Sequence, residues 1–131
     1  MVAIAIIAGL FTVGSFIDMG VINRRSISAE QLALVSILQK ARNQAMSNID
    51  HIEHGVHIDP DAYTLFEGTN YSPISLTNEI ITKSGKTTIS GLNDIYFAQL
   101  SGEPSTTGLI TLNNGTVTKT INIINGGLID W

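Results

Sequence analysis

Six groups that can bind a metal ion lie within eleven residues near the middle of the chain, in the segment HIEHGVHIDPD: His51, Glu53, His54, His57, Asp59 and Asp61. Imidazole nitrogens and carboxylate oxygens are common zinc ligands, and carboxylates on a tight turn also suit calcium. The spacing is not that of the zinc-protease motif HExxH. A helix would place His51 and His54 on one face, but His57 follows Gly55 on a predicted strand. Nothing in the spacing therefore brings the three histidines together.

A structural interpretation of this segment is simpler. The helix dipole mildly favours imidazolium at a helix C-terminus, and Asp59-Pro60-Asp61 has the composition of a tight turn. We therefore predict no metal and no cofactor. The candidate ligands to compare with a structure are His51, His54, His57, Asp59 and Asp61.

Signs of catalysis are weak in the rest of the chain. Ser101 and Ser105 could act as nucleophiles beside a histidine, but no GxSxG nucleophile elbow accompanies them. Residues 84–87, Ser-Gly-Lys-Thr, resemble the end of a phosphate-binding loop but lack its upstream glycine, so a hairpin turn is the better interpretation. We predict that the protein is not an enzyme.

The N-terminal segment Met1–Ile17 contains no charged side chain. A helix of this length, at about 1.5 Å per residue, falls slightly short of the roughly 30 Å hydrocarbon core of a bilayer. The basic residues and the small-residue cleavage site of a secretory signal are not present. We predict that residues 1–25 form a hydrophobic helix for a membrane or a filament core, through these side chains: Val2, Ile4, Ile6, Ile7, Leu10, Phe11, Val13, Phe16 and Ile17.

The following segment, residues 26–50, is amphipathic. Apolar residues recur at steps of three and four positions, as on one face of a helix: Leu34, Leu38, Ala41, Ala45 and Ile49. Ser28 and Gln31 have the spacing of a capping box, which would divide the helix in two. No proline lies between Met1 and Ile49, so we expect one continuous helix that packs this stripe against the head.

Residues 51–131 have the pattern of an antiparallel β-rich head. Two strands flank the Asp59-Pro60-Asp61 turn, and Asn114-Gly115 favours a two-residue hairpin turn further along. The predicted strands cover residues 55–58, 62–67, 79–82, 87–89, 95–99, 108–112 and 117–124. The fold class predicted from these elements is α+β.

Charge is distributed unevenly along the chain. The helical segment has a net charge of +3, from Arg24, Arg25, Lys40 and Arg42 against Glu30. Residues 50–131 contain nine acidic residues and three lysines, a net charge of −6. An acidic head disfavours nucleic acid as a partner. The chain has no cysteine, so disulfides and thiolate metal sites are excluded.

Several stretches of the sequence resemble one protein family. Met1–Leu10 (MVAIAIIAGL) is similar to the interior of the prepilin N-terminal motif, and Leu34–Asn48 (LVSILQKARNQAMSN) to the helix that follows it. Gly55–Glu67 and Leu100–Leu112 are similar to the opening hairpin and later strands of the family's heads. The chain thus resembles a type IV pilin-like protein, closest to the minor pseudopilins of type II secretion systems.

This resemblance implies a pilin-like fold, in which a long N-terminal helix with a membrane-spanning first half packs on an antiparallel β-sheet head. It also implies assembly into a filament, with other copies or related pilins as partners. The inner membrane would hold the subunit before assembly, and the filament would be extracellular or periplasmic. A prepilin peptidase and an assembly machinery are further implied partners. The family's methylated terminus and glutamate would precede the matched part, so we expect Met1 to be an internal methionine.

The predicted function is therefore a structural subunit of a type IV pilus-like or type II secretion pseudopilus filament. Small residues among branched ones near the N-terminus suit close packing between copies: Ala3, Ala5, Ala8 and Gly9. The alternative is a membrane-tethered extracytoplasmic binding module, an adhesin or DNA-uptake pilin, in which the same tether displays the head.

Overall fold

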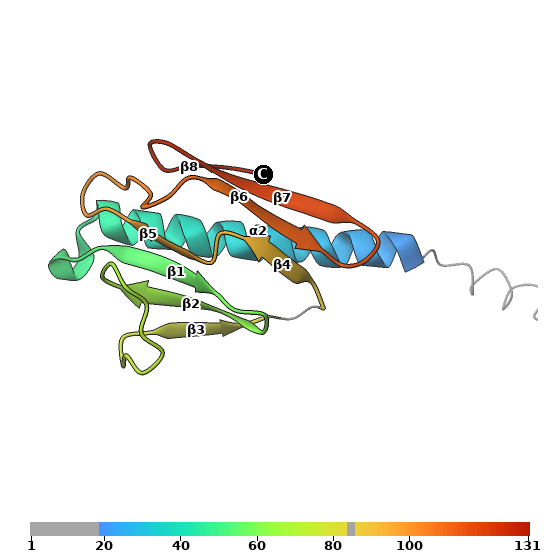
Figure 1. The fold of residues 1–131 in the computed structure, drawn as a ribbon, viewed down its shortest axis with the longest axis horizontal. Helices are drawn as coiled ribbons and strands as arrows, with labels where there is room; N and C mark the ends of the chain where they lie inside the picture. Colours follow the sequence, from blue (N-terminus) through green and yellow to red (C-terminus); the bar gives the residue numbers. More distant parts are fainter. Residues whose placement is uncertain (1–18, 84–85) are drawn as a thin grey trace, which may run out of the picture.

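The computed structural model describes residues 19–83 and 86–131, with side chains described from Arg25 onward. The filament-core residues predicted within Val2–Ile17 lie outside this part of the chain. The elements follow one another as shown in Figure 1: α2 (Met19–Met46), the 3-10 turn η1 (Ile49–His51), β1 (His54–Ile58), β2 (Ala62–Glu67), β3 (Glu79–Thr82), β4 (Thr88–Gly91), β5 (Asp94–Phe97), β6 (Gly108–Asn113), β7 (Thr118–Ile124) and β8 (Leu128–Asp130).

The strands form two antiparallel sheets of four strands each. Sheet A has the order β3-β2-β1-β5, and sheet B has the order β4-β6-β7-β8. Although β4 precedes β5 in the chain, β4 belongs to sheet B and β5 returns to sheet A. Helix α2 contacts both sheets, and Figure 1 shows β7 and β8 of sheet B above it and β1, β2 and β3 of sheet A below it.

Helix α2 is unbroken because no proline interrupts it and the backbone continues through Ser28, so the alternative break at the capping box is absent. The helix ends at Met46, before Asn48 adopts a left-handed backbone with φ of 55°. Its buried side chains cover a broad arc rather than a narrow stripe: Ile27, Glu30, Gln31, Leu34, Val35, Ile37, Leu38, Ala41 and Ala45.

The predicted fold class, a pilin-like helix with a membrane-spanning first half packed on an antiparallel sheet, is wrong. Two four-stranded sheets cover α2. Within residues 19–83 and 86–131, no helix is both long enough and apolar enough to cross a bilayer. The physical reason for the second sheet is the breadth of the buried arc on α2. One sheet covers a single side of a helix, so the other apolar flank has to be buried by a second layer.

Two hairpins show how turn residues set the strand register. At the Asp59-Pro60-Asp61 turn, β1 and β2 pair Ile58 with Tyr63. Between β6 and β7 the predicted two-residue turn is wrong, because Asn113 pairs with Thr118 and four residues form the loop. The side chain of Asn113 accepts from the backbone N–H of Gly115 at 2.6 Å, and that of Asn114 accepts from Val117 N–H at 2.8 Å. These local bonds stabilise the longer loop.

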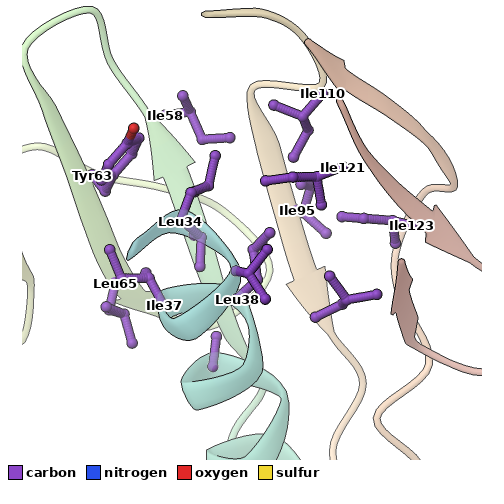
Figure 2. Packing of buried hydrophobic residues seen from close by; sticks show 14 of the residues in the cluster. Leu34, Ile37, Leu38, Ile58, Tyr63, Leu65, Ile95, Ile110, Ile121 and Ile123 are labelled. Carbon is purple, nitrogen blue, oxygen red and sulfur yellow. The ribbon is translucent and has the colours of Figure 1, made fainter. Parts of the chain in front are cut away.

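One hydrophobic core lies between α2 and the facing surfaces of both sheets (Figure 2). Apolar side chains from three layers meet there, so the described head folds as a single unit around its helix. The labelled residues of this core are Leu34, Ile37 and Leu38 from α2, Ile58, Tyr63, Leu65 and Ile95 from sheet A, and Ile110, Ile121 and Ile123 from sheet B.

Candidate functional site

Helix α2 has a buried side along its C-terminal half. Four of the packing residues expected from the sequence have no exposed surface: Leu34, Leu38, Ala41 and Ala45. The fifth, Ile49, is 43% exposed. It lies in η1, after the helix has ended at Met46, so the helical period no longer applies to it. The head is thus fixed to α2 by packing over about three turns.

Two buried polar side chains also hold α2 in place. Glu30 is 4% exposed and accepts a hydrogen bond from the Tyr63 hydroxyl on β2. Next to it, Gln31 Nε2 donates to Thr120 O on β7 at 2.8 Å. Neighbouring helix residues therefore bond to opposite sheets, which fixes the position of the helix along both. Burial, the hydrogen bond to Glu30 and the charge of Glu30 all raise the pKa of the Tyr63 phenol.

Tyr63→Phe is expected to lower the free energy of unfolding by about 1–3 kcal/mol near pH 8, because a buried acceptor loses its donor. Above about pH 10 an unfolded tyrosine releases its proton, whereas folded Tyr63 retains it. The free energy of unfolding of the wild-type protein therefore falls by up to about 1.4 kcal/mol per pH unit because of Tyr63, and that of the variant does not. Urea unfolding near pH 8 and near pH 11 measures both effects.

Tyr96→Phe is the matched control, since the Tyr96 side chain is half-buried on β5 and none of the hydrogen bonds of the described residues uses its hydroxyl. Two results would contradict the assigned role of the Glu30–Tyr63 pair. One is that Tyr96→Phe lowers the free energy of unfolding as much as Tyr63→Phe does. The other is that the difference in free energy of unfolding between wild type and Tyr63→Phe is as large near pH 11 as near pH 8.

The three histidines of the candidate metal site have separate local partners. In η1, His51 Nδ1 lies 2.9 Å from Asn48 Nδ2. The ring of His54 is buried, with Nε2 2.9 Å from Ile49 O. Within the described residues, His57 is the one histidine of the three that contacts a carboxylate. In the part of the chain that the structure describes, no three histidine or acidic side chains are grouped in a way that could hold a metal ion.

His57 is held between two carboxylates on the outer face of sheet A. Its Nε2 lies 3.0 Å from Asp59 Oδ1 and its Nδ1 lies 2.5 Å from Asp94 Oδ1. The ring of Tyr71 stacks on the imidazole, with centroids 3.8 Å apart and planes inclined by 8°. Asp61 takes no part in this cluster; its backbone oxygen accepts from Lys83 N at 2.9 Å. A pocket of about 540 Å³ beside the cluster reaches β4.

Sequence reasoning missed Asp94 and Tyr71. Asp94 meets His57 because β1 pairs with β5, where His57 and Asp94 are directly opposite. That pairing joins positions 37 residues apart, and strand periodicity carries no information about which distant strand is the neighbour. Tyr71 was expected from the sequence to be a core or cross-strand aromatic, but it lies in the loop between β2 and β3 and stacks on His57.

Between Ser36 and Asn43, the exposed side chains of α2 are polar or basic. Lys40 pairs with Glu79 on β3, with Nζ 2.7 Å from Oε2. Arg42 Nη2 donates to Gly126 O at 3.1 Å. Between α2 and the end of sheet B lies a groove of about 670 Å³, lined by Gln39, Arg42, Asn43, Gly126, Gly127, Leu128, Ile129 and Trp131. Amides and a guanidinium suit contact with another protein surface better than acid–base chemistry.

The chain as a whole matches no protein-family model, no curated protein and no solved structure.

Proposed function

We propose that the chain is a structural subunit of a type IV pilus-like or type II secretion pseudopilus filament, assembling through its hydrophobic N-terminal segment. The observation that carries this proposal is the position of α2. Its C-terminal half packs in the core of the head, and the helix begins at Met19, two positions after the uncharged segment Met1–Ile17 ends in the sequence. In a filament, α2 would thereby lead from the contacts between copies into the core of the head.

Rigid attachment matters for a filament because force on the assembly segment is transmitted to the head. Glu30 and Gln31 bond to sheets A and B respectively, and apolar packing extends from Ile27 to Ala45. Displacing α2 along its axis would break both hydrogen bonds and expose this apolar surface to water. The head is therefore suited to remain folded while its helix is pulled.

The proposal includes the partners and locations expected of such a subunit. Copies of this chain or related pilins would pack through residues 1–25, after storage in the inner membrane and processing by a prepilin peptidase. The assembled filament would lie outside the inner membrane. The role is structural rather than enzymatic, and the head would face outward.

Electron microscopy of the full-length protein, made together with a pilus or pseudopilus assembly machinery, tests the proposal. Filaments are the expected result, and dispersed monomers from the same cells would refute it.

Ile7→Arg is expected to abolish filaments while the head stays folded. An arginine near the middle of an apolar segment costs about 2.5–3.5 kcal/mol in a bilayer, and it also prevents close packing between copies. The control is Leu109→Arg, which also replaces a large aliphatic side chain with arginine, at a position that is 52% exposed on β6. Normal filaments from Ile7→Arg would exclude the N-terminal segment as the assembly element.

A second candidate function is the membrane-tethered binding module, an adhesin or DNA-uptake pilin. One observation favours it: the loop between β2 and β3 presents Ile74 and Leu76, which are 86% and 101% exposed. The net charge of −6 in residues 50–131 opposes direct DNA binding. Monomers that remain in the membrane and still attach cells to a surface would favour this module over the filament.

A further inference from the structure

His57 connects three segments of sheet A that are separate in the sequence. Its imidazole bonds to Asp59 in the β1–β2 turn and to Asp94 at the start of β5. Tyr71, from the β2–β3 loop, covers the face of the ring. The His57 side chain is 17% exposed, whereas those of Asp59 and Asp94 are 45% and 57% exposed. The ring is therefore sheltered, and its two partners have access to water.

The number of hydrogens on the ring decides whether both bonds can form. An ionised carboxylate only accepts hydrogen bonds, so each ring nitrogen needs its own N–H. Imidazolium has two N–H groups and neutral imidazole has one. With a neutral ring, one carboxylate faces a nitrogen lone pair, and that contact becomes repulsive. The observed arrangement, with a carboxylate at each nitrogen, fits the charged ring.

The loop of residues 68–78 depends on this ring through Tyr71. Tyr71 stacks on His57 and also lies 5.8 Å, between ring centroids, from Phe66. Within the loop, Asn78 Nδ2 donates to Ser72 O at 2.6 Å, and Ser75 N donates to the same oxygen at 3.2 Å. The loop is thus a compact unit. Its first residue is held by Gly68 N, which donates to Glu53 O at 2.7 Å, and Tyr71 adds the ring contacts with the outer face of sheet A.

We propose that His57 is a proton-controlled clasp for the loop of residues 68–78. With a proton on both ring nitrogens, His57 joins the β1–β2 turn to β5, and this fixed ring is the surface on which Tyr71 stacks. Loss of one proton releases one carboxylate, weakens the stack and frees the loop. The pair Ile74 and Leu76 is then no longer held in a fixed position on the head.

The groups around His57 are consistent with this proposal. The titratable side chains that face it are Asp59, Asp94 and Tyr71, and its neighbour on β2 is Thr64. The closest wall of the adjoining pocket is formed by uncharged residues of β4 and of the segment before β5: Thr87, Thr88, Ile89 and Asn93. Lys83 Nζ is bound to Pro60 O at 2.9 Å and Thr87 O at 2.6 Å. Among residues 25–83 and 86–131, no lysine or arginine is paired with Asp59 or Asp94, so the imidazole of His57 is the basic group between them.

Hydrogen–deuterium exchange on the full chain in detergent tests the clasp, and it does so whether or not the protein forms filaments. Rates are compared at about pH 5 and about pH 8, the range in which histidine changes charge, after correction for intrinsic exchange. We expect the amides of residues 69–78 to be protected about tenfold more at the lower pH, the factor expected for one lost hydrogen bond. Equal protection at both pH values would overturn the proposal.

Three variants separate the clasp from general effects of pH. His57→Gln should remove the pH dependence, and His51→Gln, which alters an exposed histidine in η1, should retain it. In Asp94→Asn, the new amide can donate a hydrogen bond to a neutral imidazole, so the amides of residues 69–78 should stay protected at both pH values. This variant tests the clasp even if His57→Gln fails to fold. A pH dependence that persists in Asp94→Asn, or that disappears in His51→Gln, would contradict the assignment.

Discussion

Leu38→Ala is expected to lower the free energy of unfolding by about 2–5 kcal/mol, the range observed when a large aliphatic side chain is removed from a core. Leu38 has no exposed surface. Figure 2 shows it among core residues of both sheets. The cavity left by the truncation cannot close by movement of one sheet alone, because the helix is also held by the other. Urea unfolding followed by circular dichroism measures the loss.

Leu32→Ala is the control for this effect, since it makes the same change on the same helix at a side chain that is 54% exposed. We expect its free energy of unfolding to lie within about 0.5 kcal/mol of the wild-type value. If the two variants are equally stable, α2 is not the centre of the core, and its proposed role in transmitting force is lost.

Gly91→Ala is the second substitution with a large expected effect. Gly91 ends β4 with φ of 102°, a conformation that costs an alanine about 1–2 kcal/mol. A Cβ at this position would also lie 2.2 Å from the backbone oxygen of Leu109 on the paired strand β6. Backbone atoms of a paired strand cannot move without disturbing the sheet, and overpacking adds about 1–3 kcal/mol. Thermal and urea unfolding should show both costs combined.

Gly115→Ala separates these two costs. Gly115 has a similar φ of 89°, but a Cβ there would have no atom within 4 Å. Only the backbone strain should appear, so the free energy of unfolding of this variant should be about 1–2 kcal/mol below that of the wild type. A loss in Gly91→Ala no greater than in Gly115→Ala would mean that β4 and β6 are not packed as closely as described.

Local features of the fold were accessible from the sequence because they depend on neighbouring residues. The spacing of Leu34 and Leu38 indicated the buried side of the helix, and both are fully buried. The Asp59-Pro60-Asp61 turn indicated a hairpin, and β1 and β2 form it. In each case residues a few positions apart determine the structure.

The division into two sheets was not accessible in this way. Strands β4 and β5 are neighbours in the chain and have similar patterns, yet Ile89 of β4 pairs with Leu112 of β6, and Val56 of β1 pairs with Ile95 of β5. Periodicity shows which side of a strand is buried but not which strand lies beside it. The breadth of the buried arc on α2 was the missing signal. Beyond the predicted stripe, this arc includes two polar residues, Glu30 and Gln31, and three apolar ones: Ile27, Val35 and Ile37.

The same limit applies to the cluster around His57. The sequence grouped His57 with Asp59 correctly, since only two positions separate them. It also grouped them with His51 and His54, which lie near the end of α2 and bond to local partners instead. Asp94 and Tyr71 reach His57 only through long-range pairing and loop packing. What resembled a metal site in the sequence is a clasp between segments of one sheet.

In the proposed filament, copies of this chain assemble through the segment Met1–Ile17 while the two-sheet head faces outward on α2. Cryo-electron microscopy of filaments from the full-length protein tests this arrangement most directly. The account predicts that residues 1–17 of successive copies lie in contact along the filament axis, with both sheets intact at the periphery. Filaments held together by head-to-head contacts, with residues 1–17 away from the axis, would contradict it.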